Sequence, residues 1–209
     1  MRRSVLFALL LAALSSTFGP ARAADRIGYI GCSQARDAVS GYHMVGGTKF
    51  WPALNEYGGG SVVTWARGVG SGSPYWNTFK SYLASQPPSK IWIQWCTRAG
   101  ENQAENQAAA VAVLGEVRRL APGVPVYVSA QNGYFLPHSC GISGLDGPFR
   151  MELLARQTAA LPGPDVGDLK SRYQAPSIPP GHETTPDGCH ANNVGKTKVL
   201  GPKLKAFFG

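Results

Sequence analysis

Four short runs of apolar residues divide the chain into segments. The runs are rich in Val, Ile and aromatic side chains, and they cover residues 26–31, 61–65, 90–95 and 124–130. Each run is short and hydrophobic throughout, which is typical of strands covered on both faces of a parallel sheet. The pattern therefore predicts four strands.

Between and after these runs, apolar positions recur at helical spacing. The predicted helices cover residues 74–85, 101–120, 148–160 and 192–208. Pro122-Gly123 ends the second helix, and Gly201-Pro202 predicts a kink or a restart inside the last one. Strands that alternate with helices in this way indicate an α/β fold with a central parallel sheet and crossover helices.

Two long stretches rich in Gly and Pro follow the fourth predicted strand. They cover residues 131–147 and 162–188. Loops of this length inside a compact domain are usually functional or pinned by cross-links.

The first residues have the pattern of a secretion signal. Met1-Arg2-Arg3 precedes an apolar run over residues 5–14, and Ala21-Arg22-Ala23 supplies small residues for cleavage. The apolar run is shorter than the ~20 residues of a spanning helix. We therefore expect residues 1–23 to be a removed signal peptide, residues 24–209 to form a single domain without stable membrane insertion, and the protein to be secreted.

The charge of the mature chain is modestly positive. Cleavage after Ala23 removes three arginines, which lowers 20 basic residues to 17 against 12 acidic ones and the net charge from +8 to +5. Lys and Arg are scattered apart from Arg118-Arg119 and residues 196–205, without the interleaved aromatics of a nucleic-acid groove. We expect no nucleic-acid partner and a solvated basic surface that tolerates anionic cell-wall polymers.

The chain has four cysteines, which in an exported protein most often form two disulfides. Three connectivities are possible. A metal site built from Cys189, His190 and His182 lacks the paired spacing of metal ligands. We expect neither a metal nor a cofactor.

Candidate chemistry lies at the two ends of the mature chain. Asp187 and His190 are three positions apart, so the carboxylate can fold back and orient the imidazole. Ser33 follows a strand-like segment that ends at Gly31, where a nucleophile can be presented. Taken alone, a serine after a glycine is usually only a turn residue. Cys32 is an alternative nucleophile, although exported cysteines are more often oxidised.

These motifs, in this order, resemble the SGNH or GDSL hydrolase superfamily. The resemblance implies a flavodoxin-like three-layer α/β/α sandwich and ester cleavage through a Ser-His-Asp triad. Ser33 stands where the family has its nucleophile, with Cys32 in place of the usual Asp. By the same resemblance His190 is the general base and Asp187 its partner.

Two further blocks of the resemblance concern the oxyanion hole. The glycine-rich turn over residues 67–72 implies Gly70 as a backbone donor, with Gly72 nearly as good. After the third strand the family has an Asn donor, whereas this chain reads Trp95-Cys96-Thr97-Arg98. Thr97 takes the Asn position best, and the alternatives are Arg98, Gln94 and Asn102.

The implied strand order also bears on the cysteines. It places the first strand beside the third, so that Cys32 pairs with Cys96 and leaves Cys140 for Cys189. Trp95 and Arg98 follow at the carboxyl end of the third strand, where ligands bind, and are predicted to contact the substrate.

The resulting hypothesis is a secreted, monomeric serine esterase that acts on a small-molecule, carbohydrate or lipid ester. Two alternatives remain at this point. One is a binding protein that has lost catalysis on the same fold, suggested by the altered third block. The other is an acyltransferase that uses the same acyl-enzyme.

Overall fold

The structure is a computed structural model that describes residues 25–135, 139–160, 171–182 and 188–209. The predicted signal peptide, residues 1–23, lies outside the described residues, as does Asp187.

The centre of the fold is a parallel sheet of four strands in the order β1-β2-β3-β5. The strands are β1 (Ile27–Ile30), β2 (Lys90–Trp95), β3 (Val126–Ala130) and β5 (Ser171–Arg172). Outside β1, Phe50 forms one further parallel bridge with Ile27. The first strand is therefore flanked on both sides, as a flavodoxin-like order requires. A separate parallel ladder joins β4 (Gly133–Tyr134) to β6 (Ser177–Ile178).

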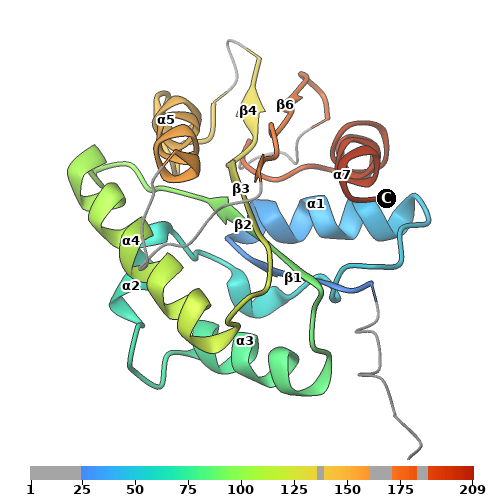
Figure 1. The fold of residues 1–209 in the computed structure, drawn as a ribbon. Helices are drawn as coiled ribbons and strands as arrows, with labels where there is room; N and C mark the ends of the chain where they lie inside the picture. Colours follow the sequence, from blue (N-terminus) through green and yellow to red (C-terminus); the bar gives the residue numbers. More distant parts are fainter. Residues whose placement is uncertain (1–24, 136–138, 161–170, 183–187) are drawn as a thin grey trace, which may run out of the picture.

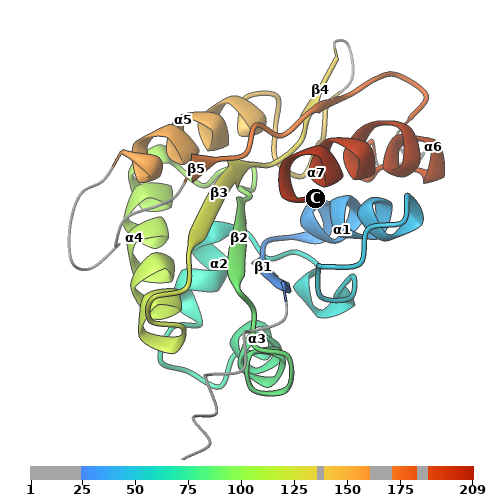
Figure 2. The ribbon, with the colours of Figure 1, turned by 45° about the vertical axis from the view of Figure 1, so that its right-hand side comes forward.

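Helices cover both faces of this sheet, so the fold is a three-layer α/β/α sandwich (Figures 1 and 2). One face is covered by α1 (Ser33–Met44) and by the C-terminal helical segment, which consists of α6 (Asn193–Gly195), the π-helical turn η2 (Lys196–Leu200) and α7 (Gly201–Phe208). The other face is covered by α2 (Val62–Arg67), α3 (Pro74–Ser85), α4 (Gln103–Leu120) and α5 (Gly147–Ala159). A short 3₁₀ helix, η1 (Asn55–Tyr57), precedes α2. The predicted fold class is confirmed.

Most elements lie where the apolar pattern predicts them, but the second predicted strand is wrong. Residues 61–65 begin the helix α2. Ser61 caps that helix, since its Oγ accepts the N–H of Thr64 at 3.2 Å, and the Trp65 indole donates to the carbonyl of Gly31 at 2.9 Å. These contacts outweigh the strand preference of the β-branched residues.

The C-terminal helical segment runs through Gly201-Pro202 by way of the π-helical turn. Pro202 stands in the first turn of α7, where its missing N–H removes little from the helix. π-helical turns are rare and occur mostly as single turns inside α-helices, as here.

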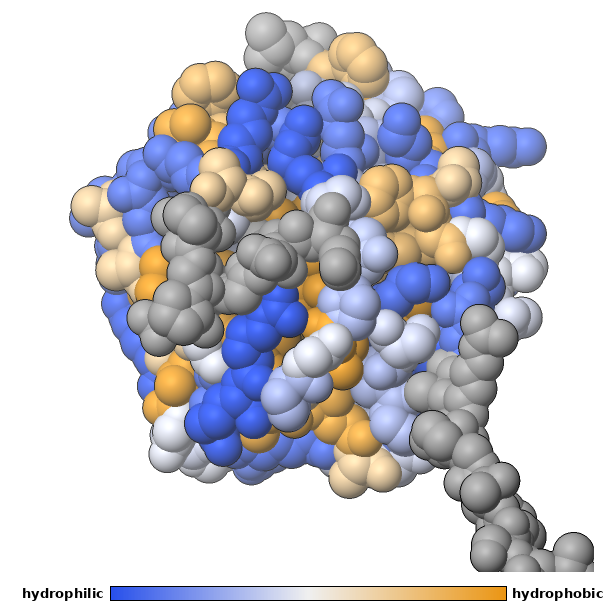
Figure 3. Space-filling model, viewed as in Figure 1, coloured by the Kyte–Doolittle hydropathy of each residue, from blue (hydrophilic) through white to orange (hydrophobic). Residues whose placement is uncertain are grey.

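The face seen in Figure 1 mixes hydrophilic and hydrophobic residues (Figure 3). Within the described ranges, the helices are too short or too polar for any of them to cross a membrane.

Helix α1 packs closely against the C-terminal helical segment through two glycines. A Cβ on Gly201 would lie 2.2 Å from the carbonyl oxygen of Gly41, and one on Gly41 would lie 2.4 Å from the carbonyl oxygen of Lys196. Both distances are far shorter than real contacts of a Cβ. Glycine at these positions therefore sets the spacing between the two helices.

Replacing Gly41 with alanine is expected to force the helices apart. Overpacking of this kind costs about 1–3 kcal/mol, more than the ~1 kcal/mol by which alanine is the better helix former. The free energy of unfolding, measured by urea denaturation, should fall. Gly72→Ala is the matched control because open space surrounds Gly72, and it should leave stability nearly unchanged. Equal stability of Gly41→Ala and the wild type would contradict the close packing.

Candidate active site

A pocket of about 340 Å³ opens at the carboxyl ends of β1, β2 and β3. Its lining comes from six separate parts of the chain. The lining residues are Cys32, Ser33, Gln34, Arg36, Gly58, Gly59, Ser61, Cys96, Thr97, Arg98, Gln131, Cys140, Ile142, Ser143, Cys189 and His190. Ser33 and His190, which the sequence places far apart, share this pocket.

Ser33 is the first residue of α1 and is half-buried. The residue before it, Cys32, has an extended backbone and is bonded to Cys96, with 6.2 Å between the Cα atoms. Because β1 and β2 are hydrogen-bonded neighbours, the two cysteines leave adjacent strand ends. The disulfide thus fixes the chain immediately before the predicted nucleophile. It also removes Cys32 as a nucleophile, since an oxidised cysteine has no thiolate.

His190 is half-buried in a segment that is held on both sides. The residue before it, Cys189, is bonded to Cys140, and its carbonyl accepts the Tyr134 hydroxyl at 2.5 Å. The residue after it, Ala191, donates its N–H to the buried Asp37 carboxylate at 3.2 Å. Asp37 lies four residues after Ser33 on α1, so one helix carries the serine and anchors the histidine segment.

Both predicted disulfide pairings, Cys32–Cys96 and Cys140–Cys189, are confirmed. All four cysteines line the pocket, and each disulfide stands directly beside a predicted catalytic residue.

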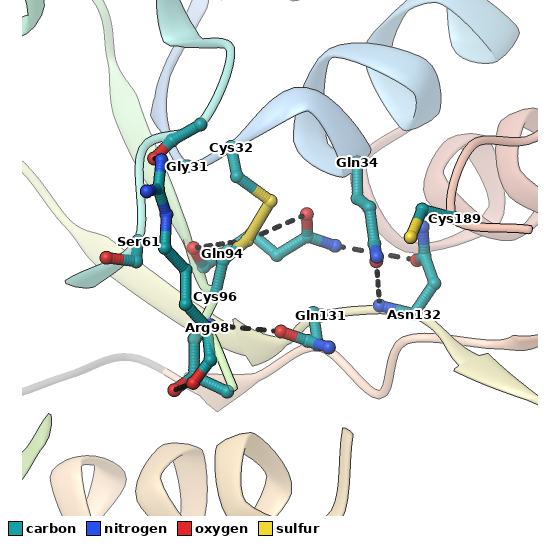
Figure 4. Close-up of a disulfide and its surroundings, with 12 residues drawn as sticks. Gly31, Cys32, Gln34, Ser61, Gln94, Cys96, Arg98, Gln131, Asn132 and Cys189 are labelled. Atoms are coloured by element: carbon teal, nitrogen blue, oxygen red, sulfur yellow. Dashed lines mark hydrogen bonds between the residues drawn. A yellow bond between two sulfur atoms is a disulfide. The ribbon is translucent and has the colours of Figure 1, made fainter. Parts of the chain in front are cut away.

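A second link between α1 and the histidine segment runs through side-chain amides. Gln34 accepts the N–H of Asn132 at 3.0 Å and donates to the Tyr134 hydroxyl at 2.8 Å, and this hydroxyl binds Cys189. Figure 4 shows Gln34, Asn132 and Gln94 beside the Cys32–Cys96 disulfide. Gln34 thus ties the start of α1 to the end of β3 and to the histidine segment.

On the side of the pocket formed by the loop before α2 and the end of β2, one carboxylate binds three groups of the protein. Glu101 accepts the Ser61 hydroxyl at 2.7 Å with one oxygen, and the Arg98 N–H at 2.9 Å and the Thr97 hydroxyl at 3.1 Å with the other. The Arg98 guanidinium donates to the carbonyl of Gly59 at 2.9 Å. This arrangement joins the loop before α2 to the end of β2.

Thr97 lines the pocket, but its hydroxyl, the predicted donor, and its backbone N–H are both bound within the protein. Its N–H donates to the Gln131 side chain at 3.0 Å, and its hydroxyl is bound to Glu101 and accepts from Asn106. It is therefore not placed to donate to an oxyanion.

The alternatives for the third oxyanion donor lie elsewhere. Gln94 is buried beside Asn132, with 3.5 Å between its Nε2 and the Oδ1 of Asn132, and Asn102 caps α4 by accepting the N–H of Glu105. Neither residue lines the pocket, whereas Arg98 does.

Gly70 and Gly72 are not in the lining either. They lie in the turn after α2. The sequence predicted a strand where α2 begins, so the turn was expected at the end of a strand. The glycines that line the pocket are Gly58 and Gly59, directly before the cap of α2. The signal for them in the sequence was a run of three glycines before Ser61.

Gly59 lines the pocket in a left-handed backbone conformation. Its φ is +75°, which favours glycine. The N–H groups of Gly58, Gly60 and Ser61 donate to backbone carbonyls of the same loop. For the N–H of Gly59, no acceptor is found in the described part of the chain.

Trp95 belongs to the core instead of the pocket. Its side chain is 1% exposed, and its indole N–H donates to Thr158 of α5 at 3.1 Å. The prediction that Trp95 contacts the substrate is wrong. It lies at the carboxyl end of β2, but its side chain points to the face of the sheet that α5 covers.

Metal ligands are not grouped in the described ranges. There, no three His, Cys, Asp or Glu side chains stand close enough to hold an ion.

Comparisons with known proteins give distant likenesses among solved structures. No protein-family model and no curated protein matches the chain. Among solved structures, it is similar to a serine-to-alanine mutant of an acetyl esterase crystallised with an acetate ion. The identity is 14% and the TM-score 0.49, over 88% of this chain and 97% of that one. Because both values are low, the function of this chain has to be inferred from its own pocket.

Removing the Asp37 carboxylate is expected to loosen the histidine segment. Besides Ala191, Asp37 binds the Lys196 ammonium at 3.2 Å, so Asp37→Ala leaves two donors without their acceptor. Hydrogen bonds to charged groups contribute about 1.5–3 kcal/mol, and the free energy of unfolding should fall by that amount.

Two further variants make this measurement specific. Asp37→Asn keeps an oxygen for Ala191 and should lose about half as much. Ser40→Ala, on the same helix, should change stability by less than about 0.5 kcal/mol. Guanidinium denaturation measures all three, and an alanine variant as stable as the wild type would disprove the anchoring role.

Proposed function

We propose that this protein is a serine hydrolase that cleaves carboxylic ester bonds, with Ser33 as nucleophile and His190 as general base. The observation that carries the proposal is that both residues line one pocket, on segments that α1 holds together through Asp37 and Gln34. Asp187, the predicted orienting carboxylate, lies outside the described residues. Its role rests on the resemblance to SGNH hydrolases.

The reaction follows from these assignments. Ser33 Oγ attacks the ester carbonyl while its proton passes to the His190 imidazole, which gives a tetrahedral oxyanion. The C–O bond to the alcohol then breaks, and the alcohol leaves with the proton from His190. Water attacks the acyl-enzyme in the same way and releases the carboxylic acid and Ser33.

The oxyanion forms on the carbon that Ser33 Oγ has attacked, and it is stabilised by hydrogen-bond donors that are already in position beside it. We assign this role to the N–H of Ser33 and the N–H of Gly59, in place of Gly70. The N–H of Ser33 belongs to the first turn of α1, where helix N–H groups lack helical acceptors. The N–H of Gly59 is the one in its loop for which the described residues offer no acceptor.

Export of the protein is part of the proposal. Four cysteines paired in two disulfides suit an oxidising compartment, which supports a secreted protein whose residues 1–23 are a signal peptide. Its substrate is then an ester of a small molecule, a carbohydrate or a lipid outside the cell.

A binding protein without catalysis is the second candidate. The specific observation in its favour is Thr97, whose N–H and hydroxyl are both used within the protein where the family has an oxyanion donor. Loss of one such donor typically costs about 10²- to 10³-fold in turnover.

Replacing Ser33 with alanine separates these candidates. We expect the wild type to be labelled by a fluorophosphonate at Ser33 and to hydrolyse short acyl esters. Ser33→Ala should lose the label and at least about 10³-fold in kcat, because the nucleophile is absent.

The control is Ser40→Ala, a serine on the same helix outside the pocket. It should keep both the label and the activity. Mass spectrometry locates the label and a chromogenic ester assay gives the rate. Hydrolysis that survives in Ser33→Ala, or an oxidised wild type that takes no label and cleaves no ester, would overturn the proposal.

A further inference from the structure

The charged residues of the pocket are all basic. Arg36 and Arg98 line it together with His190, and the described part of its lining contains no Asp or Glu. Two guanidinium groups therefore give the described lining of the pocket a positive charge.

Arg36 is placed by the same helix as the nucleophile. It lies three residues after Ser33, so both side chains are on one face of α1. Its guanidinium reaches across to the loop before α2, where it lies 3.4 Å from the Asn55 side chain. Its side chain is 29% exposed, so it remains accessible from the pocket.

Within the described residues, the carboxylate of Asp37 neutralises Arg36 only in part. Asp37 is 3.7 Å from Arg36, but the same carboxylate is 3.2 Å from Lys196 and accepts the N–H of Ala191. One negative charge is therefore shared between two cations. Arg36 retains donors and positive charge for another partner.

Arg98 approaches the same loop from the other side. Its Nη2 donates to the carbonyl of Gly59 at 2.9 Å, and Arg98 as a whole is exposed. The Glu101 carboxylate binds the backbone N–H of Arg98 and does not line the pocket. The two arginines thus contact the same segment, Arg36 at Asn55 and Arg98 at Gly59, and this segment supplies Gly58 and Gly59 to one wall of the pocket.

We propose that this wall binds an anionic group of the substrate, so that the pocket prefers esters that carry a carboxylate or a similar oxyanion. Guanidinium forks match such groups in charge and shape. The inference rests on the proposed ester hydrolysis and names its substrate class. Arg36 and Arg98 are binding residues in this scheme, and the bond chemistry remains with Ser33 and His190.

The test compares matched substrates that differ in one charge. Para-acetoxybenzoate carries a carboxylate on the alcohol part of the ester, and para-acetoxybenzamide carries a neutral amide at the same position. In the second pair, the para-nitrophenyl monoester of adipic acid carries the carboxylate on the acyl part, and para-nitrophenyl hexanoate has a methyl group there. We expect kcat/KM to be about tenfold higher for the anionic member of at least one pair, mostly through a lower KM, and to fall as salt screens the charges.

Variants assign the preference to the wall. Arg36→Gln should reduce the anionic preference about fivefold, and Arg36→Lys should restore part of it because charge-assisted contacts need the cation. Arg98→Gln should act in the same direction. Arg67→Gln is the matched control, since Arg67 is on α2 outside the pocket and paired with Glu105 at 3.2 Å. It should leave the preference unchanged.

A binding measurement keeps this inference separate from the catalytic proposal. Para-acetamidobenzoate and para-acetamidobenzamide are amide analogues, and calorimetry on the wild type and Ser33→Ala should show tighter binding of the anion, weakened by Arg36→Gln. If no ester is cleaved but this difference persists, the hydrolase proposal falls and anion binding stands. Equal rates and equal affinities within the pairs, or a preference that Arg36→Gln and Arg98→Gln leave intact, would overturn the inference.

Discussion

The packing of α1 against the C-terminal helical segment is the constraint on which the pocket depends. The N-terminus of α1 presents Ser33, and its middle lies on the C-terminal helical segment through Gly41 and Gly201. Asp37, between these two points, binds the chain directly after His190. The two predicted catalytic residues are therefore placed relative to each other by one rigid helix, and any shift along this interface would separate them.

The other wall is built from groups that hold each other. Glu101 joins Ser61, Thr97 and Arg98, and Gln131 takes the remaining N–H of Thr97. Thr97 thus serves to fix the end of β2. In the proposed reaction, donation to the oxyanion is assigned to backbone N–H groups, which need no particular side chain, and the assigned Gly59 has the positive φ that favours glycine.

Sequence reasoning succeeds where the signal is local or follows from strand order. The runs behind β1, β2 and β3 are buried on both faces, so their composition alone identifies them. The pairing of Cys32 with Cys96 follows once the first and third predicted strands are neighbours.

It fails where tertiary contacts decide. The apolar pattern does not predict helix α1, because the buried polar residues Gln34 and Asp37 interrupt its apolar face. Residues 61–65 begin a helix through contacts with other parts of the chain, so Gly70 follows α2 outside the pocket, and the glycines in the pocket lining are Gly58 and Gly59.

The positive charge at the pocket wall acts on two stages of the proposed reaction. For a neutral ester, Arg36 and Arg98 meet negative charge only when the oxyanion forms, so their field favours the transition state and raises kcat. For an ester that already carries an anion, the same field also stabilises the bound ground state. That part of the attraction lowers KM without accelerating the chemical step, so substrate charge and turnover are separable properties of this wall.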